Sequence, residues 1–299
     1  MGRRLLSTSH GTHRGAFGPV DWARFLSLAL IWGSSFVLIA IGLDAFEPGV
    51  VTWGRVLSGA AVFAFTPGAR APIAREDVPR LVAVSLLWVA IPFTLFPLAE
   101  ERVASAVAGM LNGATPIVTA VVASLLLRKL PGRLQLVGLA LGFLGVALIA
   151  IPVAGEGSSE TIGVVMLIVA ASCYGVAINL VVPLQQRYGP LPVMSRVLVL
   201  AAVFNAPFGL FGLPGSTFAW GSLLAVLALG AVGTGIAFVL MGNLAGRVGG
   251  TRASFVTYLV PVVALLLGVV VRDDVVAAVS VLGIGCVIVG ALLASRRET

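Results

Sequence analysis

Two arginines stand inside long apolar stretches, and their chemistry suggests a binding site. Arg55 lies seven residues after Pro48, and Arg196 lies four residues after Pro192. A guanidinium in apolar surroundings is costly, so it usually faces a cavity or a polar partner. Its planar N–H groups suit a carboxylate. We predict that both arginines bind an anionic group of a small molecule; the alternative is that each extends its head group to the nearest aqueous surface.

Aromatic and polar side chains accompany these arginines in the apolar stretches. Tryptophan rings can line a site for an organic solute, and their faces attract cations. Amide and phenol groups can hydrogen-bond a ligand, although they serve equally well between helices. The predicted substrate-binding residues are Trp32, Trp53, Trp88, Asn112, Tyr174 and Tyr258, together with Arg55 and Arg196.

Residues that bind metals or form covalent intermediates are scarce. The two histidines, His10 and His13, lie in the polar N-terminal segment, and the two cysteines, Cys173 and Cys286, lie far apart in apolar stretches. Lys129 is the single lysine and lies in a polar loop, which leaves a Ser–Lys hydrolase without support. The sequence therefore predicts no metal, no cofactor and no enzymatic activity.

Composition places these residues in a membrane protein. Of 299 residues, 59% are hydrophobic and 10% charged, and the mean hydropathy is +1.09. Stretches of roughly 20 apolar residues recur along the chain, each long enough to cross a hydrocarbon core of about 30 Å as a helix. The net charge of +7 is spread over short loops, which argues against nucleic-acid binding. We predict an all-α integral membrane protein in contact with the lipid bilayer.

Ten transmembrane helices can be drawn in these stretches. Their predicted ranges are Phe25–Leu43, Pro48–Thr66, Arg80–Leu98, Val103–Leu127, Leu134–Pro152, Ile162–Leu184, Pro192–Leu213, Ala219–Leu244, Ala253–Val271 and Val275–Ala294. The boundary between the third and fourth helices, at Ala99–Arg102, and the corresponding one at Gly246–Arg252 each divide one long hydrophobic hairpin.

The two halves of the chain resemble each other at a constant offset. Residues 145 positions apart match at several places: Arg102 with Arg247, Pro116 with Pro261, Gly138 with Gly283, and Gly145 with Gly290. The stretches around Arg55 and Arg196 match at an offset of 141. This pattern predicts two five-helix repeats, residues 25–153 and 161–295. An odd number of helices per repeat requires the second repeat to be inverted. Pro116 and Pro261 are predicted to be paired hinges.

Charged loops predict the orientation. Of the 19 Lys and Arg residues, fifteen fall on the side of the N-terminus, whereas Arg102 and Arg272 fall on the other side and Arg55 and Arg196 lie within helices. This bias predicts that both termini are cytoplasmic in a multi-pass protein of the plasma or inner membrane. Residues 1–24 are polar and basic, and we predict that they form a disordered cytoplasmic tail.

Several stretches resemble the EamA-type branch of the drug/metabolite transporter superfamily. The resemblance spans about residues 22–295 and is carried by Ile31–Phe36 (IWGSSF), Arg55, Thr115-Pro116 and Leu134–Gly138. One departure is Arg128-Lys129, which stands where the family often has a Gly-Glu pair. The resemblance implies ten helices in two inverted five-helix repeats and transport of small organic solutes such as amino acids or drug-like amines.

The function predicted from these observations is secondary transport, in the direction of export, by alternating access between two repeats. No Asp or Glu falls near the middle of a predicted helix, so coupling through the carboxylates at the helix ends (Glu100, Glu101, Asp273 and Asp274) or facilitated exchange is favoured over a buried proton relay. A channel or a non-transporting scaffold is the alternative class. A lipid-modifying enzyme is a further alternative that lacks a catalytic constellation.

Overall fold

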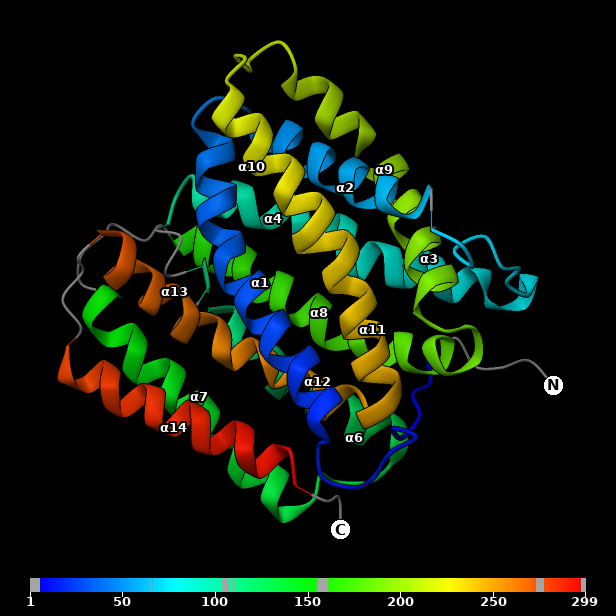
Figure 1. The fold of residues 1–299 in the computed structure, drawn as a ribbon, viewed down its shortest axis with the longest axis vertical. Helices are drawn as coiled ribbons and strands as arrows, with labels where there is room; N and C mark the ends of the chain where they lie inside the picture. The colour runs from blue at the N-terminus through cyan, green and yellow to red at the C-terminus, as the bar shows by residue number, and fades with distance from the viewer. Residues whose placement is uncertain are drawn as a thin grey trace.

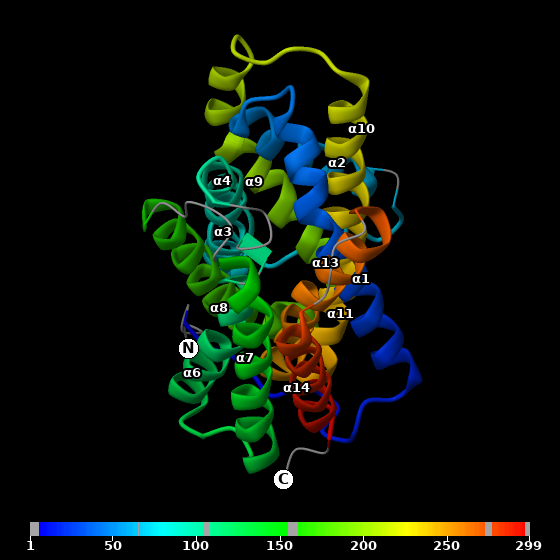
Figure 2. The ribbon, with the colours of Figure 1, turned by 90° about the vertical axis from the view of Figure 1, so that its left-hand side faces the viewer.

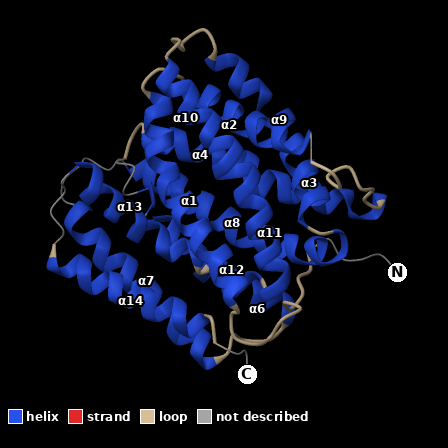
Figure 3. Cartoon of the chain, viewed as in Figure 1, coloured by secondary structure: helices blue, strands red, loops and turns tan. Residues whose placement is uncertain are grey.

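Helices account for every regular element that the computed structural model describes, which covers residues 6–64, 66–103, 108–109, 111–154, 161–272 and 277–296 (Figures 1 and 3). Five helical stretches are long and apolar enough to cross a membrane: Pro19–Leu43, Arg75–Glu100, Thr161–Tyr188, Pro190–Gly212 and Trp220–Val248. Shorter apolar helices cover Asn112–Leu127, Arg133–Ile149 and Ala278–Ala294. The all-α membrane fold is confirmed, while the number of ten transmembrane helices remains a prediction.

The elements of the first half begin with the long helix α1 and end with α7. They are α1 (Pro19–Leu43), α2 (Pro48–Ala64), η1 (Arg75–Asp77), α3 (Val78–Ser85), η2 (Leu86–Ala90), α4 (Ile91–Glu100), η3 (Asn112–Ala114), α6 (Thr115–Leu127) and α7 (Arg133–Ala154).

The elements of the second half begin with the long helix α8 and end with α14. They are α8 (Thr161–Tyr188), α9 (Pro190–Gly212), α10 (Trp220–Gly230), η4 (Ala231–Ile236), α11 (Ala237–Val248), α12 (Gly250–Ser254), α13 (Val256–Arg272) and α14 (Ala278–Ala294). Both predicted hairpin divisions appear, one after Glu100 and one at Gly249, whose φ of 88° a residue with a side chain rarely adopts.

Glycines bring α7 and α14 into direct backbone contact, and they do so in repeat-related pairs. A Cβ at Gly138 would lie 2.8 Å from the carbonyl oxygen of Gly290, and one at Gly145 would lie 2.5 Å from that of Gly283. Gly283 is 145 positions from Gly138, and Gly290 is 145 from Gly145. Figures 1 and 2 show the two helices side by side. The last helices of the two repeats therefore pack through equivalent residues.

A second pair of contacts, between other helices, also joins repeat-equivalent residues. A Cβ at Gly33 of α1 would meet Val263 of α13, and one at Gly175 of α8 would meet Val118 of α6, each at 2.5 Å. The glycines are 142 positions apart and the valines 145. When residue i of one half contacts j of the other, and the equivalents of i and j also meet, the halves are related by a two-fold axis. This exchange supports two repeats that are related by a two-fold axis.

Two π-helical turns interrupt long helices at equivalent positions. The first, η2, starts at Leu86 between α3 and α4, and the second, η4, starts at Ala231 between α10 and α11, 145 positions later. A π turn widens the helix and is frequent at functional sites. Hydropathy alone did not predict these turns, because the stretches stay apolar through them.

Residues 6–18, which precede α1, lie against the ends of other helices, which differs from the disordered tail predicted for residues 1–24. The amide of His13 donates to the carbonyl of Arg247 at 2.8 Å. Arg252, which is 1% exposed, donates to the carbonyl of Gly15 at 2.8 Å, and its guanidinium lies 4.8 Å from the ring centroid of Phe17. Figure 1 shows this dark-blue segment passing beneath α12. Backbone groups make most of these bonds, so the polar composition did not reveal them.

The two predicted hinge prolines occupy different local structures. Pro116 is the second residue of α6, and this helix directly follows the 3-10 turn η3. Pro261 lies inside α13. Proline is well tolerated in the first turn of a helix but removes a hydrogen bond in its interior. The hinge function of this pair remains a prediction.

Candidate functional site

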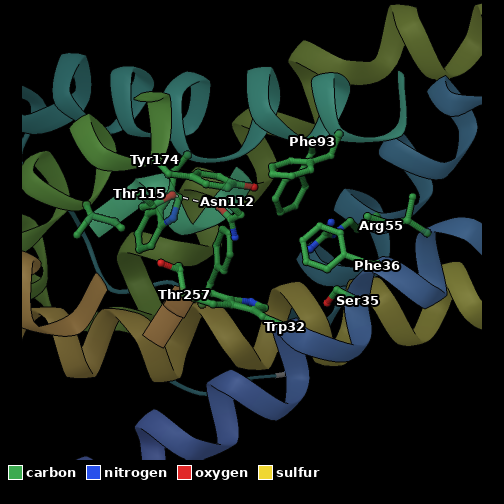
Figure 4. Close-up of a pocket in the computed structure, with 14 residues that line it drawn as sticks. Trp32, Ser35, Phe36, Arg55, Phe93, Asn112, Thr115, Tyr174 and Thr257 are labelled. Atoms are coloured by element: carbon green, nitrogen blue, oxygen red, sulfur yellow. Dashed lines mark hydrogen bonds between the residues drawn. The ribbon is translucent and has the colours of Figure 1, made fainter. Parts of the chain in front are cut away.

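A cavity lies where the two halves meet (Figure 4). Its wall is mostly aromatic and aliphatic, with a few hydroxyl and amide groups and one charged side chain. It is lined by Trp32, Ser35, Phe36, Ile39, Arg55, Trp88, Phe93, Phe96, Asn112, Thr115, Tyr174, Ile178, Phe238 and Thr257. A concave, mostly apolar wall with a few polar groups is the usual form of a small-molecule site.

Both halves contribute equivalent positions to this wall. Phe93 and Phe238 are 145 positions apart, and their ring centroids are 5.9 Å apart. The other repeat-related pairs in the lining are Asn112 with Thr257, at the same offset, and Trp32 with Tyr174, at an offset of 142. The cavity therefore lies around the two-fold relation between the repeats, as expected for a transport site.

Arg55 of α2 is the charged residue among those that line the cavity. Its side chain belongs to a residue only 7% exposed. The Nε–H donates to Thr234 Oγ1 at 2.8 Å, and Cζ lies 3.8 Å from the ring centroid of Phe93. The two terminal nitrogens donate no hydrogen bond to any residue that the structure describes, and Figure 4 shows the guanidinium pointing into the cavity. Two N–H donors of the planar group are therefore available to a ligand.

The π turn η4 contacts both Arg55 and Trp32. Thr234 Oγ1 donates to the carbonyl of Leu229 at 3.1 Å while it accepts from Arg55, which holds the hydroxyl in one direction. The indole Nε1–H of Trp32 donates to the carbonyl of Gly233 at 3.1 Å. Thr234 was not among the predicted site residues. The signal that singles it out is its place within a π turn, and the sequence does not show that turn.

Neutral polar groups lie at the other end of the cavity from Arg55 (Figure 4). Thr115 Oγ1 donates to Asn112 Oδ1 at 3.1 Å, and Thr257 Oγ1 donates to the carbonyl of Ser254 at 2.9 Å. The Tyr174 ring stacks on Phe96 with centroids 5.9 Å apart. Of the predicted site residues, the structure brings Arg55, Trp32, Trp88, Asn112 and Tyr174 together around this one cavity.

Trp53 and Tyr258 were predicted to bind substrate, but their side chains lie outside the lining. The indole of Trp53 donates to the carbonyl of Ala202 at 3.0 Å and packs against α9. The hydroxyl of Tyr258 donates to the carbonyl of Leu139 at 3.1 Å, with its ring against Gly142. Both side chains connect neighbouring helices, the alternative use of such groups in lipid.

Arg196 was also predicted to bind substrate, and its side chain points away from the cavity. One terminal nitrogen donates to the carbonyl of Ala69 at 2.8 Å, and the other donates to that of Arg70 at 3.2 Å. These acceptors lie in the loop after α2. The arginine therefore satisfies its charge at the end of the helix bundle, which is the alternative considered for it.

Carboxylates gather around a second, more open hollow. It is lined by Asp44, Glu47, Glu100 and Glu101 together with residues of the loop between α9 and α10. Two of these, Glu100 and Glu101, are among the carboxylates predicted to serve in coupling. Asp273 and Asp274 lie outside the described residues. The coupling role of these groups remains a prediction.

Comparison with known proteins gives a consistent family. The model of the EamA-like transporter family matches twice, at residues 23–151 and 161–296. A probable terminal-alkyne amino-acid exporter of Streptantibioticus cattleyicolor is 29% identical over 92% of this chain and 93% of its own. An uncharacterized transporter of Archaeoglobus fulgidus is 23% identical over 93% and 99%.

A further relative and a solved structure are also similar to this chain. The uncharacterized inner membrane transporter YedA of Escherichia coli is 26% identical over 92% of this chain and 90% of its own. One solved crystal structure superposes with a TM-score of 0.72 at 19% identity, covering 92% of this chain and 96% of that one. At that identity the superposition establishes the fold alone.

Proposed function

The chain belongs to the EamA-like transporter family, and from this premise we propose that it transports a small organic solute that carries one carboxylate. The family and its named relatives make the chain a membrane transporter rather than an enzyme. The substrate and the mode of transport are what we propose here. A neutral amino acid, or a close analogue, fits the cavity best.

The guanidinium of Arg55 carries this proposal. It is buried, held at Nε by Thr234, stacked on Phe93, and left with two outward donors. A carboxylate can accept both donors at once in the two-pronged geometry that an arginine prefers. In apolar surroundings this bond is stronger than in water, because little solvent competes for it.

The rest of the wall suits the remainder of an amino acid. Aromatic faces of Trp32, Trp88 and Tyr174 can hold an apolar side chain, and a face can also attract an ammonium group. Asn112 supplies neutral polar contact at the far end. One relative's name specifies an amino-acid exporter, which supports this substrate class and the direction of export.

We propose alternating access as the mechanism. Two repeats that meet at one central site can rock against each other and expose the site to either side in turn. The glycine contacts between α7 and α14 allow close sliding of helix backbones. A channel, by contrast, would keep both ends open together.

Counterflow in proteoliposomes tests the function. Vesicles loaded with unlabelled leucine or phenylalanine should accumulate the labelled amino acid transiently, and the rate should saturate with concentration. Phenethylamine and isoamylamine, which lack the carboxylate, should compete at least about tenfold less well, because they leave the Arg55 donors without an acceptor. A flux that rises linearly without counterflow would indicate a channel, and equal competition by the amines would refute carboxylate recognition.

The orientation of the chain is proposed from its loop charges. Both termini face the cytoplasm, so the loop between the repeats faces outward. A single cysteine introduced by Ser158→Cys, in a variant whose Cys173 and Cys286 are replaced by Ala, should react with an impermeant maleimide in intact cells. A cysteine introduced by Arg296→Cys in the same background, at an exposed position after α14, is the control and should react only after permeabilisation. The reverse labelling pattern would invert the proposed topology.

A further inference from the structure

Residues 7–17, which we call the strap, join the two repeats across one end of the helix bundle (Figure 1). In the first repeat, Arg80 of α3 donates to Ser7 Oγ at 2.5 Å. In the second repeat, Gln186 of α8 accepts from Ser9 Oγ at 2.7 Å, and its Nε2 donates to the carbonyl of the next strap residue, also at 2.7 Å. The strap is therefore bonded to both halves of the chain, in addition to its contacts with α11 and α12.

The strap fits closely against helix backbone at Gly11, which is buried. A Cβ at this position would lie 2.4 Å from the backbone nitrogen of Gly249, which joins α11 to α12, and 2.6 Å from the carbonyl oxygen of Arg247. Backbone atoms at the ends of packed helices cannot rotate away as a side chain can. A residue with a larger side chain at position 11 would therefore force the strap off this surface.

A hollow lies under the strap, next to the cavity. It is lined by residues 8–11 of the strap, by residues of α12, and by Ala123 of α6 and Asn179 of α8. Asn179 directly follows Ile178, which lines the cavity. The cavity and the hollow therefore lie at successive levels of α8, and the strap covers the hollow at the end of the bundle.

A contact between α6 and α8 separates the hollow from the cavity. The side-chain nitrogen of Asn179, a residue 1% exposed, donates to the carbonyl of Thr119 at 2.9 Å. Thr119 is one helical turn after Thr115, which lines the cavity, and its hydroxyl donates to the carbonyl of Thr115 at 2.8 Å. Because α6 belongs to the first repeat and α8 to the second, rocking of one repeat against the other would open or close this contact.

We infer that the strap is a gate, which must leave the hollow before the cavity can open on the side of the N-terminus. This inference rests on the alternating access proposed above. Opening at this end requires α6 and α8 to separate, and a segment that is bonded to both repeats opposes their separation. The strap therefore stabilises the state of the transporter that is closed to the cytoplasm.

Two substitutions release the strap in different ways. Gly11→Val adds a side chain that meets the backbone of Gly249. Gln186→Leu, at an exposed position of α8, removes the two side-chain bonds to the strap and leaves the strap sequence unchanged. Thr12→Val is the matched control, because it introduces the same side chain at the adjacent position, which is exposed.

A single cysteine on the cavity wall reports the opening. Ser35→Cys, in a variant that lacks both native cysteines, places a thiol at a residue that lines the cavity and is 5% exposed. A charged methanethiosulfonate reagent added to inside-out vesicles reaches the protein from the cytoplasmic face. Gly11→Val and Gln186→Leu should each raise the rate of modification at least about tenfold, because bonds that hold the closed state are lost. Thr12→Val should leave the rate unchanged.

Two further reporters distinguish a gate from a simple cover and from unfolding. Ala123→Cys places the thiol in the hollow, and a strap that only covers the hollow would expose this thiol but not that of Ser35→Cys. Ala170→Cys, at a fully buried position of α8, should stay unreactive in a folded protein. The inference is overturned if the rate at Ser35→Cys is unchanged in both strap variants, or if Ala170→Cys reacts in both of them, which would give the strap a role in folding.

The labelling needs no substrate, so its outcome is independent of the counterflow experiment. Failure of leucine and phenylalanine to exchange would refute the proposed substrate and leave the gate supported or overturned by labelling alone. If the label at Ser158→Cys reverses the proposed topology, the reagent is added to intact cells instead, and the same rates are compared.

Discussion

Replacement of Arg55 by Ala should lower the transport of a carboxylated solute by about 100-fold. The variant loses both donors that face the cavity, and hydrogen bonds to charged groups contribute about 1.5–3 kcal/mol each. Folding should be preserved, because removal of a buried guanidinium also removes the cost of its desolvation. The initial rate of counterflow in proteoliposomes, at matched protein content, measures the effect.

Two further substitutions at Arg55 separate charge from geometry. Arg55→Lys keeps the charge but replaces the planar pair of donors by a compact ammonium, so it should recover only part of the transport. Arg55→Met keeps apolar volume and should behave like Arg55→Ala. Arg196→Met serves as the matched control, since its guanidinium donates to loop carbonyls outside the cavity. Normal transport by Arg55→Ala would remove the main support for carboxylate recognition.

The substitution Gly145→Val should destabilise the protein by about 3 kcal/mol or more. A Cβ at Gly145 would lie 2.5 Å from the carbonyl oxygen of Gly283, and the neighbour at that point is helix backbone, which cannot rotate out of the way. Overpacking in a close-packed interior typically costs about 1–3 kcal/mol even when side chains can adjust. The melting temperature and the yield of monodisperse protein in detergent measure the loss.

Gly285→Val provides the control for this substitution on the facing helix. Gly285 is exposed, and a Cβ there would meet nothing within 4 Å, so the same added volume should change the melting temperature little. A Gly283→Val variant should reproduce the effect of Gly145→Val, because a Cβ at Gly283 would lie 2.6 Å from the carbonyl oxygen of Gly145. Equal stability of Gly145→Val and Gly285→Val would show that α7 and α14 can separate without cost.

The positions of the cavity residues show which site residues can be predicted from the sequence. Trp32, Arg55, Trp88, Asn112 and Tyr174 were predicted as site residues because a polar or aromatic group within a membrane helix usually faces a cavity or another helix. The same rule also selected side chains that lie at helix contacts. A helical stretch that is apolar on all sides does not indicate which of its faces is turned inward.

The membrane class, the two repeats and the family follow from the sequence alone, because hydropathy, offset and motif order are properties of the chain read along its length. Which of the two arginines within the helices enters the cavity was decided by tertiary structure. Arg55 lies beside Thr234 and Phe93 at the cavity, whereas Arg196 donates to the carbonyls of Ala69 and Arg70. The direction of a long side chain depends on the volume and the hydrogen-bond acceptors that distant segments place beside it, and only the folded chain brings those segments together.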